Sequence, residues 1–135
     1  MSEIKSLIIV PFDAAGKRVQ DTIKRALREM GVEPILVDEI IEPGAAWSNT
    51  INDAIRESDF IFIDLSRQSP NAIYELGIAH GLRKPTFLLL STEAKSGLPS
   101  YLAGYQYIVY DPDNLRSLFQ QVQRMARFIV KRDDD

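Results

Sequence analysis

The segment Ser58–Leu90 decides the fold, and it reads SDFIFIDLSRQSPNAIYELGIAHGLRKPTFLLL. Its apolar run FIFI favours a strand that is buried on both faces of a parallel sheet. The pair Ser69-Pro70 is a helix-start signal, with a capping side chain before a proline, and a helix is predicted over residues 70–82. A second apolar run, Thr86 to Leu90, follows as the next buried strand. This segment alone therefore predicts a strand, a loop, a helix and a strand.

The rest of the chain continues this alternation of strands and helices. We expect further strands at 7–10, 34–37 and 106–110, and further helices at 17–30, 45–57 and 111–131. Residues 38–44 and 91–104 are expected to be loops, the second of them a lid or the edge of a pocket. The alternation predicts an α/β fold of three layers, with a doubly wound five-stranded parallel sheet in the flavodoxin-like order 2-1-3-4-5. We expect residues 1–135 to form a single domain.

The composition excludes several kinds of site and partner. The chain has 135 residues, no cysteine, one histidine and a net charge of −3. Disulfides and thiolate zinc sites are therefore impossible, and we expect no metal ion and no cofactor. We see no dense Lys/Arg cluster and no apolar run near the ~20 residues of a membrane span, so neither double-stranded nucleic acid nor a membrane is an expected partner. The start of the chain lacks the shape of a signal peptide, so a cytoplasmic location is expected, and Asp133–Asp135 is expected to be a solvated tail.

Two carboxylates stand out as candidates for chemistry. Glu75 is the only carboxylate of an otherwise apolar helix, so it either accepts hydrogen bonds from the preceding loop or lies on a cavity wall. Asp64 ends a central strand, where open parallel sheets bind their ligands, and its alternative role is to brace the local backbone. The sequence leaves both alternatives open for each residue.

Three other features lead to weaker predictions. His80, the single histidine, is expected to be a packed and hydrogen-bonded core residue. Trp47, the single tryptophan, is expected to pack in the core or to form a hydrophobic staple, and its alternative role is a stacking wall for a flat ring. Neither GxGxxG nor GxxxxGK[ST] occurs, so no dinucleotide fingerprint and no P-loop is predicted.

The predicted strand order places a crevice between the first and third strands. We expect Pro11, Phe12 and Asp13 on one side of this crevice and Asp64 with its loop on the other side. The start of the helix that carries Glu75 is expected beside them. Two acidic side chains would then meet in one hollow at the carboxyl edge of the sheet.

Several blocks of the sequence resemble a known group. Asp64-Leu65-Ser66, Asn71 and the run YELGIAH that contains Glu75 resemble the nucleoside 2-deoxyribosyltransferase-like proteins and the related TIR-like domains of bacteria. The resemblance extends over almost the whole chain, from Val10-Pro11-Phe12-Asp13 to Lys84-Pro85 and beyond. It implies that Glu75 attacks, or stabilises positive charge at, the anomeric carbon of a ribose or deoxyribose.

Further site residues follow from the crevice and the resemblance together. Asp64 is the candidate acid that protonates the leaving base. The candidate substrate-binding residues are Pro11, Phe12, Asp13, Ser66, Ser69 and Asn71. The deoxyribosyltransferases usually carry a Tyr in the first strand and an Asp at position 69, where this chain has aliphatic residues and Ser69. The TIR-like branch, whose members often hydrolyse NAD, tolerates more variation there.

Three functions remain open on the sequence. The first is cleavage of an N-glycosidic bond in a nucleotide or nucleoside through a Glu nucleophile, as in an NAD hydrolase, a deoxyribosyltransferase or a nucleoside hydrolase. The second is a non-catalytic nucleotide-binding and signalling module that oligomerises. The third is a structural subunit with a vestigial pocket. The expected ligand is a nucleotide or nucleoside, and a homo-oligomer is expected because relatives complete their sites across subunits.

Overall fold

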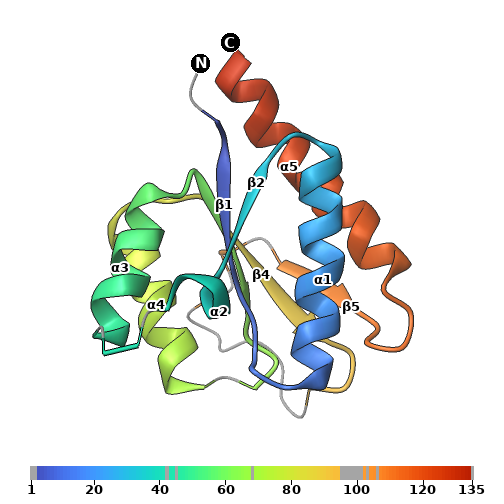
Figure 1. The fold of residues 1–135 in the computed structure, drawn as a ribbon. Coiled ribbons are helices and arrows are strands. Elements are labelled where there is room, and N and C mark those ends of the chain that lie inside the picture. The colour runs from blue at the N-terminus through green and yellow to red at the C-terminus, as the bar shows by residue number, and fades with distance from the viewer. Residues whose placement is uncertain are drawn as a thin grey trace.

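The fold is described by a computed structural model that covers residues 3–41, 43–44, 46–67, 69–94, 102, 104–105 and 107–134 (Figure 1). The strands are β1 (Lys5–Ile9), β2 (Glu33–Leu36), β3 (Phe60–Asp64), β4 (Thr86–Ser91) and β5 (Tyr107–Tyr110). The helices are α1 (Ala14–Glu29), α2 (Val37–Ile40), α3 (Trp47–Glu57), α4 (Pro70–Gly81) and α5 (Arg116–Asp134).

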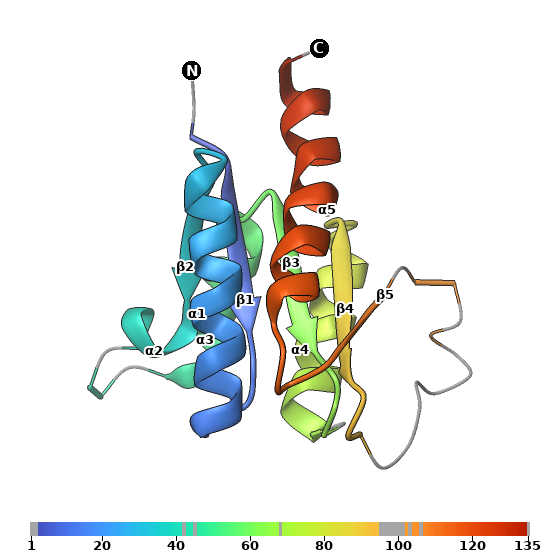
Figure 2. The ribbon, with the colours of Figure 1, turned by 90° about the vertical axis from the view of Figure 1, so that its right-hand side faces the viewer.

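The five strands form one parallel sheet in the order β2-β1-β3-β4-β5. Helices α1 and α5 lie in front of this sheet in Figure 2, and α3 and α4 lie behind it. The predicted strand order and the helices on both faces are thus confirmed, and the chain has a flavodoxin-like α/β fold. Each crossover is long enough to carry a helix, as parallel neighbours require.

Two apolar clusters hold the three layers together. Strand β3 is buried along its whole length, and its side chains alternate between the two faces of the sheet. Phe60 and Phe62 join the cluster beneath α1 and α5, while Ile61 and Ile63 join the cluster beneath α3 and α4. A continuous apolar run is what a strand covered on both faces needs, which is why this segment predicted the fold.

Several local predictions differ from the structure. Residues 38–44 were expected to be a loop, but Val37–Ile40 form the short helix α2. Helix α5 continues to Asp134, so it includes two residues of the expected tail. His80 is exposed rather than packed in the core, and its Nδ1 forms a hydrogen bond with the hydroxyl of Tyr105. Most of the predicted loop 91–104 lies outside the described residues, so its role as a lid stays a prediction.

Candidate functional site

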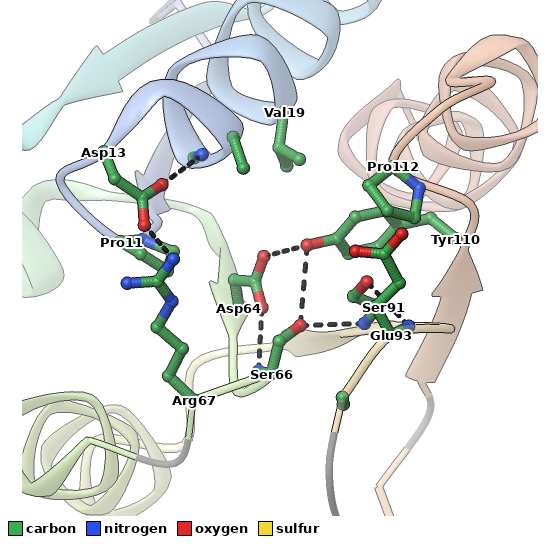
Figure 3. A pocket seen from close by; sticks show the side chains of 13 residues that line it. Pro11, Asp13, Val19, Asp64, Ser66, Arg67, Ser91, Glu93, Tyr110 and Pro112 are labelled. Atoms are coloured by element: carbon green, nitrogen blue, oxygen red, sulfur yellow. Dashed lines mark hydrogen bonds and ion pairs between the residues drawn. The ribbon is translucent and has the colours of Figure 1, made fainter.

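A cavity of about 470 Å³ opens at the carboxyl edge of the sheet, on the face that α1 and α5 cover (Figure 3). Its polar lining comes from the loops and strand ends that the fold gathers at this edge. These polar residues are Asp13, Asp64, Ser66, Arg67, Ser91, Glu93 and Tyr110. The side chains of Arg67 and Asp13 form an ion pair that joins the loop after β3 to the loop after β1.

The turn into α1 forms one wall of this cavity. Asp13 caps the helix, because its carboxylate accepts a hydrogen bond from the Gly16 backbone N–H at 2.7 Å. A Cβ atom at position 16 would lie 1.9 Å from the carbonyl oxygen of Pro11, so only glycine fits there. The cap and the close turn together hold Asp13 facing Arg67.

A network centred on Asp64 forms the floor of the cavity (Figure 3). The Asp64 carboxylate accepts hydrogen bonds from the Tyr110 hydroxyl at 2.5 Å and from the Ser66 backbone N–H at 2.8 Å. The Ser66 hydroxyl in turn accepts a hydrogen bond from the Ser91 backbone N–H at 2.7 Å. Burial, together with the nearby Asp64 carboxylate, raises the pKa of the Tyr110 hydroxyl well above its usual value. Tyr110 therefore stays protonated and ties β5 to the end of β3.

We predict that Tyr110→Phe lowers the free energy of unfolding by about 1.5–3 kcal/mol, the usual cost of a lost hydrogen bond to a charged group. The ring remains buried in the variant, so the change isolates the bond to Asp64. Urea denaturation measures the effect. The matched control is Tyr107→Phe on the same strand, whose side chain is largely exposed and is expected to change stability by less than about 0.5 kcal/mol. Equal stability of the two variants would show that the Tyr110 bond contributes nothing.

The structure gathers four of the candidate site residues and leaves four apart. Pro11, Asp13, Asp64 and Ser66 line the cavity. Phe12, Ser69, Asn71 and Glu75 do not line it. The Ser69 hydroxyl accepts a hydrogen bond from the Ala72 backbone N–H at 3.2 Å, so it acts as the predicted cap of α4, and Asn71 is exposed in the first turn of that helix.

Asp64 and Glu75 lie on opposite faces of the sheet, not in one hollow. Strand alternation directs Asp64 to the same face as Phe62, and there it binds Tyr110 under α1 and α5. Helix α4, which carries Glu75, packs on the other face against Ile63 and Leu65. The sequence placed both carboxylates at the carboxyl edge of the sheet but did not assign them to separate faces.

Glu75 is the carboxyl group with the most unusual surroundings. Only 7% of the residue is exposed, and burial raises its pKa from 4.5 to about 7. Its Oε2 atom is buried and has no hydrogen-bond partner among the residues that the structure describes. A structural carboxylate would be expected to accept hydrogen bonds, so this arrangement favours the alternative in which Glu75 serves a ligand.

An exposed aromatic pair lies at the start of α3, on the face that carries Glu75. The rings of Phe12 and Trp47 meet edge to face, with centroids 5.6 Å apart. Phe12 is 64% exposed and Trp47 41% exposed, so Trp47 is not the core residue that we expected. Its alternative role as a stacking surface for a flat ring remains open.

Sequence reasoning missed two of the residues that shape the cavity. Tyr110 is the last residue of the alternating strand β5, and nothing in its spacing signals a bond to Asp64 across the sheet. Arg67 lies in a short loop between a strand and a helix start, where one arginine carries no signal by itself.

Within the described part of the chain, no group of three His, Asp or Glu side chains could hold a metal ion, and no helix has the length and apolar character needed to cross a bilayer.

The solved structures that share this fold include a TIR domain and two enzymes. A TIR domain of a Toll-related receptor from Hydra magnipapillata has a TM-score of 0.70 and 19% identity, covering 95% of this chain and 98% of that one. A CMP N-glycosidase from Clostridium botulinum has a TM-score of 0.62 and 21% identity, covering 87% and 97%. A 2-deoxyribosyltransferase from Bacillus psychrosaccharolyticus has a TM-score of 0.64 and 17% identity, covering 88% and 90%.

The sequence itself gives the family. No curated protein matches the chain significantly. The family model described as TIR domain, however, matches residues 9–124, which include β3, β4 and the helix of Glu75. The resemblance seen in the sequence is confirmed, and the chain belongs to the TIR domain family.

Proposed function

We propose that this TIR domain cleaves the N-glycosidic bond of a nucleotide or nucleoside, with Glu75 acting at the anomeric carbon of the sugar. The observation that carries the proposal is the buried Oε2 atom of Glu75, which has no partner among the described residues. A carboxyl oxygen that has no partner in the described part of the chain is ready to interact with a substrate. The pKa of about 7 leaves a large ionised fraction of Glu75 at neutral pH.

The reaction places positive charge next to this carboxylate. As the bond between C1′ and the base nitrogen breaks, its electron pair leaves with the base and the sugar becomes an oxocarbenium-like cation. The Glu75 carboxylate stabilises that cation or forms a covalent bond to C1′, and water then attacks C1′ and supplies its hydroxyl group. Desolvation strengthens the attraction between the carboxylate and the developing cation, because the surroundings of Glu75 have a low dielectric.

The aromatic pair supplies a binding surface for the base in this proposal. Trp47 begins α3, which packs beside the helix of Glu75, and Phe12 meets it from the loop after β1. Both residues are exposed. A nucleobase stacked there gains about 1–3 kcal/mol, the usual contribution of a stacked base. The named activities of two solved structures with this fold, CMP N-glycosidase and 2-deoxyribosyltransferase, support the type of reaction.

Asp64 has no acid role in this proposal, because it lies on the other face and is bound to Tyr110. The leaving base takes any proton it needs from water. A base that is already cationic in the substrate, as in NAD, leaves as a neutral molecule and needs no proton. Substrates with such a leaving group should therefore react fastest.

The test is release of free base from a panel of NAD, CMP, AMP, their 2′-deoxy forms and the parent nucleosides, followed by chromatography. The expected result is release from at least one compound by the parent protein and by Glu57→Gln, which changes an exposed carboxylate on α3. Glu75→Gln is expected to lose the activity. Unchanged release by Glu75→Gln would exclude the proposed role of this residue.

The alternative is a nucleotide-binding module that signals through self-association without turnover. It is favoured by the exposed apolar side chains of Tyr107 and Val109 on β5, the edge strand of the sheet. Binding without base release, together with a mass in sedimentation that rises with concentration and falls in Val109→Lys, would support this module. A monomeric mass at all working concentrations would contradict it.

A further inference from the structure

Asn52, on α3, shares the unusual property of Glu75. Its Oδ1 atom is buried and has no hydrogen-bond partner among the described residues. A buried amide oxygen without a donor costs about 1–3 kcal/mol of desolvation, so an explanation is needed for its presence. Asn52 plays no part in the proposed function stated above.

Asn52 and Glu75 lie on neighbouring helices that pack against each other on the same face of the sheet. Both helices run antiparallel to the strands, and Figure 2 shows α4 beside α3 on the side toward β4. Successive side chains of an α-helix are rotated by about 100° around the helix axis. Asn52 follows the sheet-facing Ile51 by one residue, and Glu75 precedes the sheet-facing Leu76 by one residue. These opposite offsets turn Asn52 toward α4 and Glu75 toward α3.

The seam between α3 and α4 thus carries two oxygen atoms for which the described residues supply no donor. Each residue lies in the second turn of its helix, and Trp47 begins α3 one turn nearer the carboxyl edge. The chemical group that fits is one that presents two hydrogen-bond donors close together.

We infer that Asn52 is a specificity-determining residue that, together with Glu75, binds the 2′- and 3′-hydroxyl groups of a ribose. A ribose cis-diol supplies two O–H donors on adjacent carbons, and the two unpartnered oxygens accept them. A phosphate offers mainly acceptors and negative charge at neutral pH, so it is a poor match for two acceptor oxygens. A 2′-deoxyribose offers one donor fewer and leaves a buried oxygen unpaired. This inference rests on the proposed function, and it selects ribonucleotides over deoxyribonucleotides as substrates.

The role of the 2′-hydroxyl group is consistent with the chemistry of the bond that breaks. Hydrogen bonds to the hydroxyl next to the anomeric carbon strengthen as the sugar becomes cationic. Asn52 accepts such a bond without adding a second charge beside Glu75. It would therefore act as a positioning residue that holds C1′ against the Glu75 carboxylate.

The experiment compares CMP with dCMP and AMP with dAMP on the parent, Asn52→Ala and Asn52→Asp. Affinity is measured by calorimetry, and kcat/KM by base release. The parent is expected to favour each ribonucleotide about 10- to 100-fold, since a site built for a hydroxyl group rejects the analogue without it. Asn52→Ala is expected to lose at least about 10-fold toward the ribonucleotides and to leave the deoxyribonucleotides unchanged. Asn52→Asp keeps an acceptor oxygen, so it is expected to keep the preference.

The matched control is Asn49→Ala, which removes an exposed amide from the same helix and is expected to change nothing. Equal affinity of the parent for ribo and deoxy forms would overturn the inference, and so would equal losses for both forms in Asn52→Ala. If Asn52→Ala does not fold, Asn52→Asp provides the test. Equal affinity and equal kcat/KM of Asn52→Asp for the ribo and deoxy forms would then overturn the inference. Tighter binding of the ribonucleotides without any base release would support Asn52 as a binding residue. The same result would contradict the proposed reaction. Absence of binding by every compound contradicts both.

Discussion

Glu75→Gln is expected to lower the rate of base release by about 10³-fold or more, which is the largest effect expected of any single substitution in this chain. The amide has nearly the same shape as the carboxyl group, but it can neither carry the negative charge nor form the bond to C1′. The loss should appear in kcat as well as in kcat/KM, because the interaction with Glu75 is strongest in the transition state.

The pH dependence of the parent protein tests the same role without a substitution. A carboxyl group that must be ionised to act, and whose pKa is about 7, gives a kcat/KM that rises about tenfold per pH unit below 7 and levels off above 7. The residual activity of Glu75→Gln should lack this rise. A parent profile that is flat from pH 5 to pH 8 would show that another group acts at the sugar, even if Glu75→Gln were inactive.

The second large effect is on stability. In the folded protein the Glu75 carboxyl group has a pKa of about 7, against 4.5 for the reference group. Between these two values the folded state holds a proton that the unfolded state has released, so the free energy of unfolding falls as the pH rises. The full effect is about 3 kcal/mol, at 1.36 kcal/mol per pKa unit. The folded protein is therefore more stable below pH 4.5 than above pH 7 by this amount.

Glu75→Gln should remove this dependence. The stability of the variant relative to the parent is therefore expected to increase by about 2–3 kcal/mol between pH 5 and pH 8, or roughly 5–10 °C in Tm. Any fixed cost of burying the amide is the same at both pH values and cancels from this comparison. Urea denaturation of the parent, Glu75→Gln and Glu57→Gln at the two pH values measures the effect. Parallel curves for all three proteins would mean that Glu75 is hydrated in the folded state.

The architecture could be predicted from the sequence because one rule decides it at each step. The apolar run at Phe60–Ile63 needs cover on both faces, and the alternation of strands and helices then permits few topologies. The cap at Ser69 fixed the start of α4 for the same local reason. The sequence predicts a packed His80 from its spacing to Ile73 and Leu76, and it predicts Trp47 in the core or in a hydrophobic staple. Both residues are exposed, because neither residue type nor helical spacing determines burial at the end of a helix.

The site could be predicted only as a set of residues near one edge of the sheet. Topology brings Asp13, Asp64 and the start of α4 to the carboxyl edge, but the face that each side chain takes depends on strand phase and helix rotation. The sequence therefore predicts Asp64 and Glu75 in one hollow, whereas the structure has them on opposite faces of the sheet. The bond from Tyr110 to Asp64 joins residues 46 positions apart, and no local pattern predicts such a contact. The unpartnered Oδ1 atom of Asn52 is a property of the folded chain, and no sequence pattern predicts it.

The wholly parallel sheet also has a consequence for how this protein reaches its native state. Among the described strands no two neighbours form a hairpin, so every ladder joins segments that a helix or a long connection separates. Ser6 pairs with Phe60 in the central ladder, which closes a chain loop of more than fifty residues. The entropy cost of closing this loop arises before the stabilising contacts form. The folding rate is therefore expected to be low for a domain of this size. During synthesis, β2 can pair with one edge of β1, but the other edge of β1 must remain unpaired until β3 has emerged. That interval is when the nascent chain is most exposed to aggregation.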